Sequence, residues 1–178
     1  RQRCPAGAGD ERDAAARRYA GQRDSGTITT LDRAFGYAVR KDQVINACGE
    51  RAYPYGLSFN AANNRLYVAC SHNGSVNRLA VFAASASGLR RLADIGVGEG
   101  GPDGGAGVVV NPTTGHVFVT NSAANTVSVV SGATNKVIAT VLAGANPFGA
   151  ALDPGTGYLI VANRASNNLT VVQDGFAP

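Results

Sequence analysis

Hydrophobic and polar residues alternate along the chain in short runs, and the same pattern returns at a fixed spacing. The run NPTTGHVFVTNSAANTVSVV at 111–130 comes back as DPGTGYLIVANRASNNLTVV at 153–172, so equivalent positions lie 42 residues apart. In each copy a turn with glycine precedes a strand, at His116–Thr120 and at Tyr158–Ala162, and an Asn-bounded loop leads to a second strand. A fixed period with apolar alternation and turn residues inside it predicts the blades of a β-propeller.

The same unit extends towards the N-terminus. Gln43–Gly56 aligns without gaps on Lys136–Gly149, and 57–81 continues the pattern with a three-residue insertion within Ser71–Ser75. We therefore expect an all-β fold built of four-stranded antiparallel meanders. The predicted blades span 25–52 (partial), 53–101, 102–145 and 146–178 (partial), which amounts to about three blade equivalents in an incomplete ring.

An incomplete ring leaves sheet edges without neighbours, since known propellers close with about four to eight blades. The strands at Gly26–Leu31 and Leu169–Val172 lie at the two ends of the predicted repeat region. Unpaired backbone groups on an edge strand are available to another chain. We therefore expect self-association through these open edges.

Residues 1–24 fall outside the repeat and hold six arginines against four acidic residues. We interpret this mixture as a solvated, poorly ordered tail rather than a binding site for acidic partners. Within it, Asp10–Tyr19 has the composition of a short helix but no apolar stripe to bury. The predicted organisation is thus a tail at 1–24 and a repeat region at 25–178.

Composition narrows the classes of function. Hydrophobic residues make up 44% and charged residues 16% of the 178, as in globular proteins. The net charge of +4 forms no basic stripe along the repeats, so we expect no nucleic-acid partner. We also expect no membrane span, because no apolar run is long enough. The chain begins at Arg1 without a signal-peptide pattern, which indicates either a removed leader or an excerpt of a longer chain.

The three cysteines, Cys4, Cys48 and Cys70, lack the spacing of metal ligands, so we expect no metal site. Cys48 and Cys70 occupy apolar strand positions and are expected to be buried, unreactive thiols. Gly96–Gly101 formally matches a dinucleotide-binding fingerprint, but a strand rather than a helix follows. No cofactor is expected.

Three short motifs carry a family resemblance. FVTN at Phe118–Asn121, IVAN at Ile160–Asn163 and NTVSVV at Asn125–Val130 resemble the YVTN family of β-propeller repeats. The second blade departs from that repeat at Tyr67–Cys70, where Cys70 stands in place of Asn, and is closer to the related lactonase-like propellers, which include 6-phosphogluconolactonase. The resemblance implies a propeller and an extracytoplasmic location (periplasmic, secreted or cell-surface) in bacteria or archaea. It implies no particular reaction.

The predicted topology places two kinds of loop on one face of the propeller, the top face. These are the links from an outer strand to the next inner strand and the loops from each second strand to the third. Loops held by a rigid scaffold are the usual carriers of function. The polar or aromatic ligand-binding candidates there are Tyr55, His72, Asp103, Asn121, Phe148, Asn163 and Arg164.

Each candidate also has a purely structural interpretation. Asn121 and Asn163 end strands, where an Asn side chain commonly bonds its own turn backbone. Tyr55 and Phe148 both follow a proline, and we expect them to pack between adjacent blades. His72 falls in the inserted loop, where it is either a base near neutral pH or plain polar surface. No catalytic residue is assigned, because no nucleophile–base–acid set and no carboxylate pair is present.

Two classes of function remain. The first is a non-catalytic binding or surface scaffold that presents its top-face loops to a small molecule, a glycan or a protein. The alternative is part of a lactonase-type hydrolase, which only His72 and Arg164 support. A quinone- or metal-dependent oxidoreductase ranks last, because its ligand residues are missing.

Overall fold

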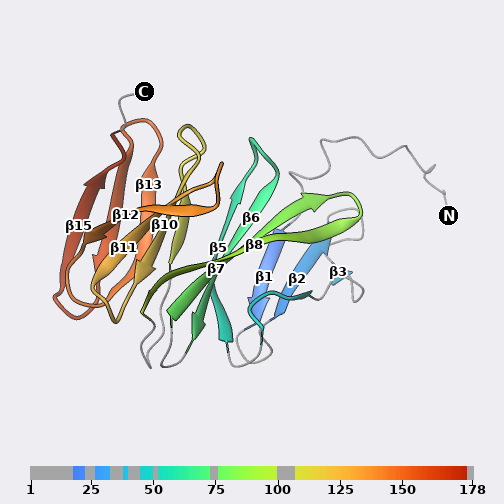
Figure 1. Ribbon diagram of the computed structural model, residues 1–178, viewed down its shortest axis with the longest axis horizontal. Coiled ribbons are helices and arrows are strands. Elements are labelled where there is room, and N and C mark those ends of the chain that lie inside the picture. Colours follow the sequence, from blue (N-terminus) through green and yellow to red (C-terminus); the bar gives the residue numbers. More distant parts are fainter. Residues whose placement is uncertain are drawn as a thin grey trace.

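The computed structural model describes residues 18–22, 27–32, 38–39, 45–49, 52–72, 76–99 and 107–175. Every regular element in these ranges is a β-strand, and the strands form four antiparallel sheets that follow one another side by side without closing a ring (Figure 1). The all-β prediction and the incomplete propeller are thereby confirmed. We call the four sheets blades one to four in chain order.

In blades two to four the strands follow in sequence order from the inner edge outwards. Blade one contains β1 (Arg18–Gln22), β2 (Thr27–Asp32), β3 (Ala38–Val39) and β4 (Ile45–Asn46), and both β3 and β4 pair with β2. Blade two contains β5 (Ala52–Asn60), β6 (Arg65–His72), β7 (Val76–Ser85) and β8 (Gly88–Glu99). Blade three contains β9 (Val108–Val110), β10 (His116–Asn121), β11 (Thr126–Ser131) and β12 (Lys136–Leu142). Blade four contains β13 (Pro147–Asp153), β14 (Tyr158–Asn163) and β15 (Asn168–Gln173).

One turn chemistry recurs between the inner and second strands. The side-chain oxygens of Asn60, Asn111 and Asp153 each accept a hydrogen bond from the backbone N–H two residues further on, at 2.9, 2.9 and 3.0 Å. Each turn then reaches a residue with positive φ just before the second strand, namely Asn64, Gly115 and Gly157. Asparagine and glycine tolerate this left-handed conformation, so the repeat's turn residues are the ones that its hairpins require.

Blade one differs from the sequence-based prediction. The strand at Arg18–Gln22 lies inside the segment assigned to a tail, and Arg18 and Tyr19 are in a strand rather than at the end of a short helix. β2 pairs with β1 on one side and with β4 on the other, so Thr27–Leu31 is not the open edge that we expected. The remainder of the predicted tail, 1–17, lies outside the described residues.

The hydrophobic core is divided among the junctions between blades. We call the side of a blade that faces the next blade its forward face. Phe118, Val127 and Val129 on the forward face of blade three pack against Leu159 and Val161 of blade four. An equivalent cluster joins blades two and three, through Tyr67, Ala69, Leu79 and Val81 on one side and Val108, Val110, Val117, Val119 and Val130 on the other. Each blade is therefore stabilised mainly by its neighbours, as in other repeat proteins.

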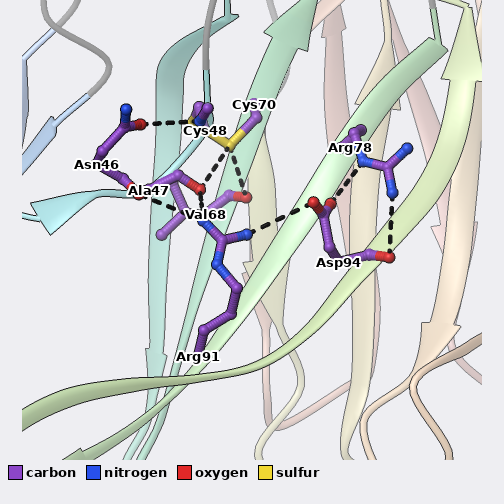
Figure 2. A network of polar contacts seen from close by, with 9 residues as sticks. Asn46, Ala47, Cys48, Val68, Cys70, Arg78, Arg91 and Asp94 are labelled. Atoms are coloured by element: carbon purple, nitrogen blue, oxygen red, sulfur yellow. Dashed lines mark hydrogen bonds and ion pairs between the residues drawn. A yellow bond between two sulfur atoms is a disulfide. The ribbon is translucent and has the colours of Figure 1, made fainter.

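The junction between blades one and two is covalent. Cys48, in the link that leaves blade one, forms a disulfide with Cys70 of β6, and the two Cα atoms lie 5.4 Å apart (Figure 2). The expectation of two buried thiols was therefore wrong, because the fold brings two cysteines that are 22 residues apart in sequence into bonding distance. Arg91 of β8 supports the same link by donating to the backbone oxygens of Ala47 at 2.5 Å and Asn46 at 3.3 Å.

In the described parts of the chain, no helix is long and apolar enough to cross a membrane. Among the same residues, no three His, Cys, Asp or Glu side chains gather as a metal site would require.

Candidate ligand site at the inner strands

Tyr55 of β5 and Phe148 of β13 meet edge to face, with ring centroids 6.4 Å apart and planes at 88°. They belong to blades two and four, so the contact reaches past blade three rather than joining adjacent blades as we expected. Beside the two rings lies a cavity of about 230 Å³, lined by Tyr55, Gly56, Leu57, Gly107, Val108, Phe148, Gly149 and Ala150. The top ends of three inner strands thus share one small hollow.

A bulge after a proline aims each aromatic side chain. In β5 the register with β6 passes from Pro54 directly to Gly56 and skips Tyr55. In β13 the pairing with β14 runs from Pro147 to Ala150, so Phe148 is skipped in the same way. Proline, which lacks an N–H, is tolerated on edge strands, and a bulge there redirects the neighbouring side chain. Both inner strands therefore turn a ring towards the cavity.

Thr120 of β10 links the residue before β9 to β13 beside the cavity. Its hydroxyl accepts a hydrogen bond from the Gly107 N–H at 2.7 Å and donates one to the Phe148 carbonyl at 2.9 Å. A Cβ atom on Gly107 would lie 2.5 Å from that same carbonyl oxygen, so only glycine allows this close approach. Thr120 was not among the candidates predicted from the sequence, although it belongs to the FVTN motif.

The chemistry that this lining offers is binding. The walls are aromatic rings, aliphatic side chains and glycine backbone, and Tyr55 is the one ionisable residue among the eight that line the cavity. Such a wall suits the less polar face of a small ring compound, with backbone groups as hydrogen-bond partners. No nucleophile and no carboxylate or imidazole base is among these lining residues.

Asn163 and Arg164 line a second hollow, of about 300 Å³, at the top of blade four. Arg164 lies exposed in the turn between β14 and β15. The Asn163 amide donates to Asn168 Oδ1 at 2.9 Å and to Thr170 Oγ1 at 2.8 Å. Asn121, its equivalent in blade three, likewise donates to Thr126 Oγ1 and Ser128 Oγ. Both amide groups donate to side chains of the following strand rather than to the turn backbone, and the Oδ1 atom of each is buried without a hydrogen-bond partner.

The same asparagines fill the space left by two glycines of the links between blades. A Cβ on Gly98 would lie 2.3 Å from Cγ of Asn121, and a Cβ on Gly144 would lie 2.6 Å from Nδ2 of Asn163. Cys70 stands at the equivalent position of blade two and bonds Cys48 of the preceding link. Each of these three junctions is therefore closed at the same place, twice by Asn against Gly and once by a disulfide.

The remaining candidates do not join the cavity. His72 is the last residue of β6, opposite Ala52, rather than a loop residue. Its Nε2 atom is buried without a hydrogen-bond partner, so the ring is not plain polar surface. Asp103 lies outside the described residues.

A polar cluster on the opposite end of the blades was not foreseen. The carboxylate of Asp174, whose side chain is fully buried, accepts hydrogen bonds from Asn111 Nδ2 and Thr114 Oγ1, both at 2.7 Å, and contacts Nδ1 of His116 at 2.9 Å. These three residues belong to blade three, while Asp174 follows the last strand of blade four. The carboxylate therefore ties the two blades together.

Comparison with known protein families identifies the class. The family model described as "Lactonase, 7-bladed beta-propeller" matches residues 22–174, so the chain belongs to that family. No curated protein sequence matches the chain with significance. The family found is the lactonase-like one, and the likeness to YVTN repeats stays a resemblance of short motifs.

Two solved structures share the fold. Hydrazine synthase from Kuenenia stuttgartiensis superposes with a TM-score of 0.67 at 15% identity, covering 85% of this chain and 52% of that chain. A putative 6-phosphogluconolactonase from Bacteroides fragilis gives a TM-score of 0.66 at 15% identity, covering 94% of this chain and 53% of that chain. This chain thus spans about half the length of these structures. At such identities the likeness shows the fold alone.

Proposed function

We propose that the chain forms part of a lactonase-type propeller and that the Tyr55–Phe148 cavity binds a small cyclic ester. The observation that carries this proposal is the cavity itself, placed where three inner strands of a lactonase-family propeller meet. Its volume of about 230 Å³ lies below the usual range for drug-sized ligands, about 300–1,000 Å³. A single six-membered ring suits it better than an extended glycan or a peptide.

The described residues have a binding role in this proposal. Phe148 is 37% exposed, which leaves part of this residue available to the apolar face of a lactone. Hydrolysis requires water to add to the ester carbonyl, the ring C–O bond to break and a proton to reach the departing oxygen. The eight lining residues hold no base for that step, so the base comes from residues outside this lining.

The absence of a base among the lining residues favours a second candidate, a binding scaffold without turnover. In that case the same cavity holds a lactone or a related small ring compound and releases it unchanged. The two candidates share the binding step and differ only in hydrolysis.

The test measures both steps on the full chain. Glucono-δ-lactone and its 6-phosphate are offered as ligands, binding is followed by ligand-observed NMR, and hydrolysis by acid release at constant pH. Phe148→Ala is expected to weaken binding about tenfold, since an aromatic contact contributes about 0.5–1.5 kcal/mol. Tyr53→Ala, a neighbouring exposed tyrosine of β5 outside the cavity lining, is the matched control and should bind as the parent does.

The outcomes separate the candidates. Binding with hydrolysis supports the lactonase, and binding without hydrolysis supports the scaffold. If neither lactone binds, or if Phe148→Ala binds as well as the parent chain, the cavity is not the site.

The Cys48–Cys70 disulfide supports an extracytoplasmic location for this function, because such bonds persist mainly outside the reducing cytosol. Fractionation of the native cells, with detection of the chain in the periplasm, at the cell surface or in the medium, is the corresponding test. Recovery from the cytosol alone, with both cysteines reduced, would contradict it.

A further inference from the structure

Thr120 is fully buried at the junction between blades three and four, and both of its partners line the Tyr55–Phe148 cavity. The Thr120 N–H donates to the Gly107 carbonyl at 3.0 Å, and the Gly107 N–H donates back to the Thr120 hydroxyl oxygen at 2.7 Å. The hydroxyl itself donates to the Phe148 carbonyl at 2.9 Å. One side chain therefore joins two lining residues that belong to different blades.

The carbonyl that Thr120 holds belongs to the residue whose ring reaches Tyr55. The register of β13 with β14 passes from Pro147 to Ala150, so Phe148 lies in a bulge of its strand. At a bulge the ladder is locally disrupted and does not fix the peptide group as it does in a regular strand. A rotation of this peptide group would carry the aromatic side chain with it. The hydrogen bond from Thr120 therefore restrains the direction in which the Phe148 ring points.

Blade packing by itself does not require a hydroxyl at this position. Ala69 is the equivalent residue of blade two, and it is fully buried in the cluster that joins blades two and three. The equivalent residue of blade four, 42 positions after Thr120, is Ala162. Of these three positions, 120 is the one with a hydroxyl, and that hydroxyl reaches a residue of the cavity. The cavity thus explains the threonine better than blade packing does.

We propose that Thr120 is a positioning residue of the ligand site, and that its hydroxyl holds the Phe148 ring where, together with Tyr55, it contacts the bound ring compound. The part of this proposal that concerns the ligand rests on the proposed function of the cavity. Thr120 acts through Phe148 and does not line the cavity itself. Removing the buried hydroxyl leaves the Gly107 N–H and the Phe148 carbonyl without this hydrogen bond, which is costly away from water. The bulge then relaxes and the ring turns.

The placement of the ring is measured first, without ligand. Nuclear Overhauser contacts between the Tyr55 and Phe148 rings are recorded on the full chain with labelled aromatic residues. The parent and Thr120→Ser, which retains the hydroxyl, should show the contact that rings with centroids 6.4 Å apart give. Thr120→Val, which has the same shape but no hydroxyl, should lose it. Thr120→Ala is the second variant without a hydroxyl, and it is expected to fold because alanine occupies the equivalent positions of blades two and four.

Binding of glucono-δ-lactone, followed by ligand-observed NMR, is measured on the same variants. Thr120→Val is expected to raise the dissociation constant about fivefold, and by no more than Phe148→Ala does, because only the contact with that one ring is impaired. Thr120→Ser should bind as the parent does. The double variant Thr120→Val with Phe148→Ala should bind like Phe148→Ala alone, since a residue that acts through the ring has no effect once the ring is gone.

Ser128→Ala is the matched control for a general loss of stability. The Ser128 hydroxyl donates to the Val97 carbonyl at 2.9 Å and accepts from Nδ2 of Asn121 at 2.9 Å. It is therefore also a buried bridge of two hydrogen bonds, but at the junction between blades two and three. Its loss should lower the melting temperature about as much as Thr120→Val does and leave the dissociation constant of the lactone unchanged.

The results separate this proposal from the proposed function. Loss of the ring contact and weaker binding in Thr120→Val, with both retained in Thr120→Ser, support it. The proposal is overturned if Thr120→Val and Thr120→Ala keep the ring contact, or if they bind as tightly as the parent does. Equal weakening by Ser128→Ala overturns it as well, because overall stability would then control binding. If the parent itself does not bind the lactone, the proposed function fails, and the ring contacts alone decide whether Thr120 orients Phe148.

Discussion

Single residues in this protein act mainly by shaping backbone that other blades contact. Thr120 illustrates this, because one hydroxyl accepts from Gly107 and donates to the Phe148 carbonyl, so a side chain of blade three fixes the inner strand of blade four. The equivalent residue of blade four is Ala162, which has no such hydroxyl. This link beside the cavity is therefore a local departure from the repeat, and departures from local rules are expected at functional sites.

Asp153 is a residue whose charge matters to its own turn. Hydrogen bonds from the Thr156 hydroxyl and from the Gly155 N–H lower the pKa of its carboxyl group. A lowered folded-state pKa means that the carboxylate's contribution to stability is present above the ordinary pKa of about 3.9 and is lost as the pH falls through the lower, folded value. The group is fully exposed, so the effect is small.

We predict that Asp153→Asn keeps the turn and removes this contribution to the pH dependence of the free energy of unfolding. An asparagine already occupies the equivalent position of blade three, where the Asn111 side chain accepts the same hydrogen bond from the Thr113 N–H at 2.9 Å. Urea unfolding between about pH 2 and pH 6 measures it, with Asp94→Asn as a control carboxylate that instead loses an exposed ion pair to Arg78. If the free energy of unfolding of the Asp153→Asn variant fell at low pH as steeply as that of the parent chain, the stability of the turn would not depend on the charge.

Among the strands, one equivalent position of the second strand closes the junctions between blades, by an asparagine in one case and by a disulfide in another. Asn121 donates to hydroxyls of Thr126 and Ser128 on the neighbouring strand. In blade two the residues opposite the equivalent part of β6 are Arg78 and Ala80, neither of which offers a hydroxyl acceptor. An asparagine at position 70 would therefore be buried without these partners, and a disulfide closes that junction instead.

Gly98→Ala is predicted to destabilise the junction between blades two and three by about 1–3 kcal/mol, the usual cost of overpacking. The added Cβ would lie 2.3 Å from Cγ of Asn121, a side chain that is fully buried and held by two hydrogen bonds. Gly96→Ala is the matched control, because its Cβ would meet its nearest neighbour, Val76, at an ordinary 3.5 Å. Equal melting temperatures for the two variants would refute a tight contact at Gly98.

Removing the disulfide is predicted to cost about 3 kcal/mol, the entropy of closing a loop of this size in the unfolded chain. The variant is Cys48→Ala with Cys70→Ala, measured by urea unfolding under oxidising conditions. Cys4→Ala is the control, since the bond joins the other two cysteines and Cys4 has no part in it. Thiol titration of the unfolded parent chain should find one free thiol among the three cysteines, and three would contradict the bond.

For the molecule as a whole, the period of 42 and its turn residues were enough to predict an all-β row of blades, because hairpin geometry depends on local chemistry. The cavity was not predictable in the same way. Tyr55 and Phe148 were selected from the sequence, but their contact depends on two bulges and on the distance between alternate blades. The strand at Arg18–Gln22 carries no apolar alternation, and pairing with β2 rather than local propensity makes it a strand.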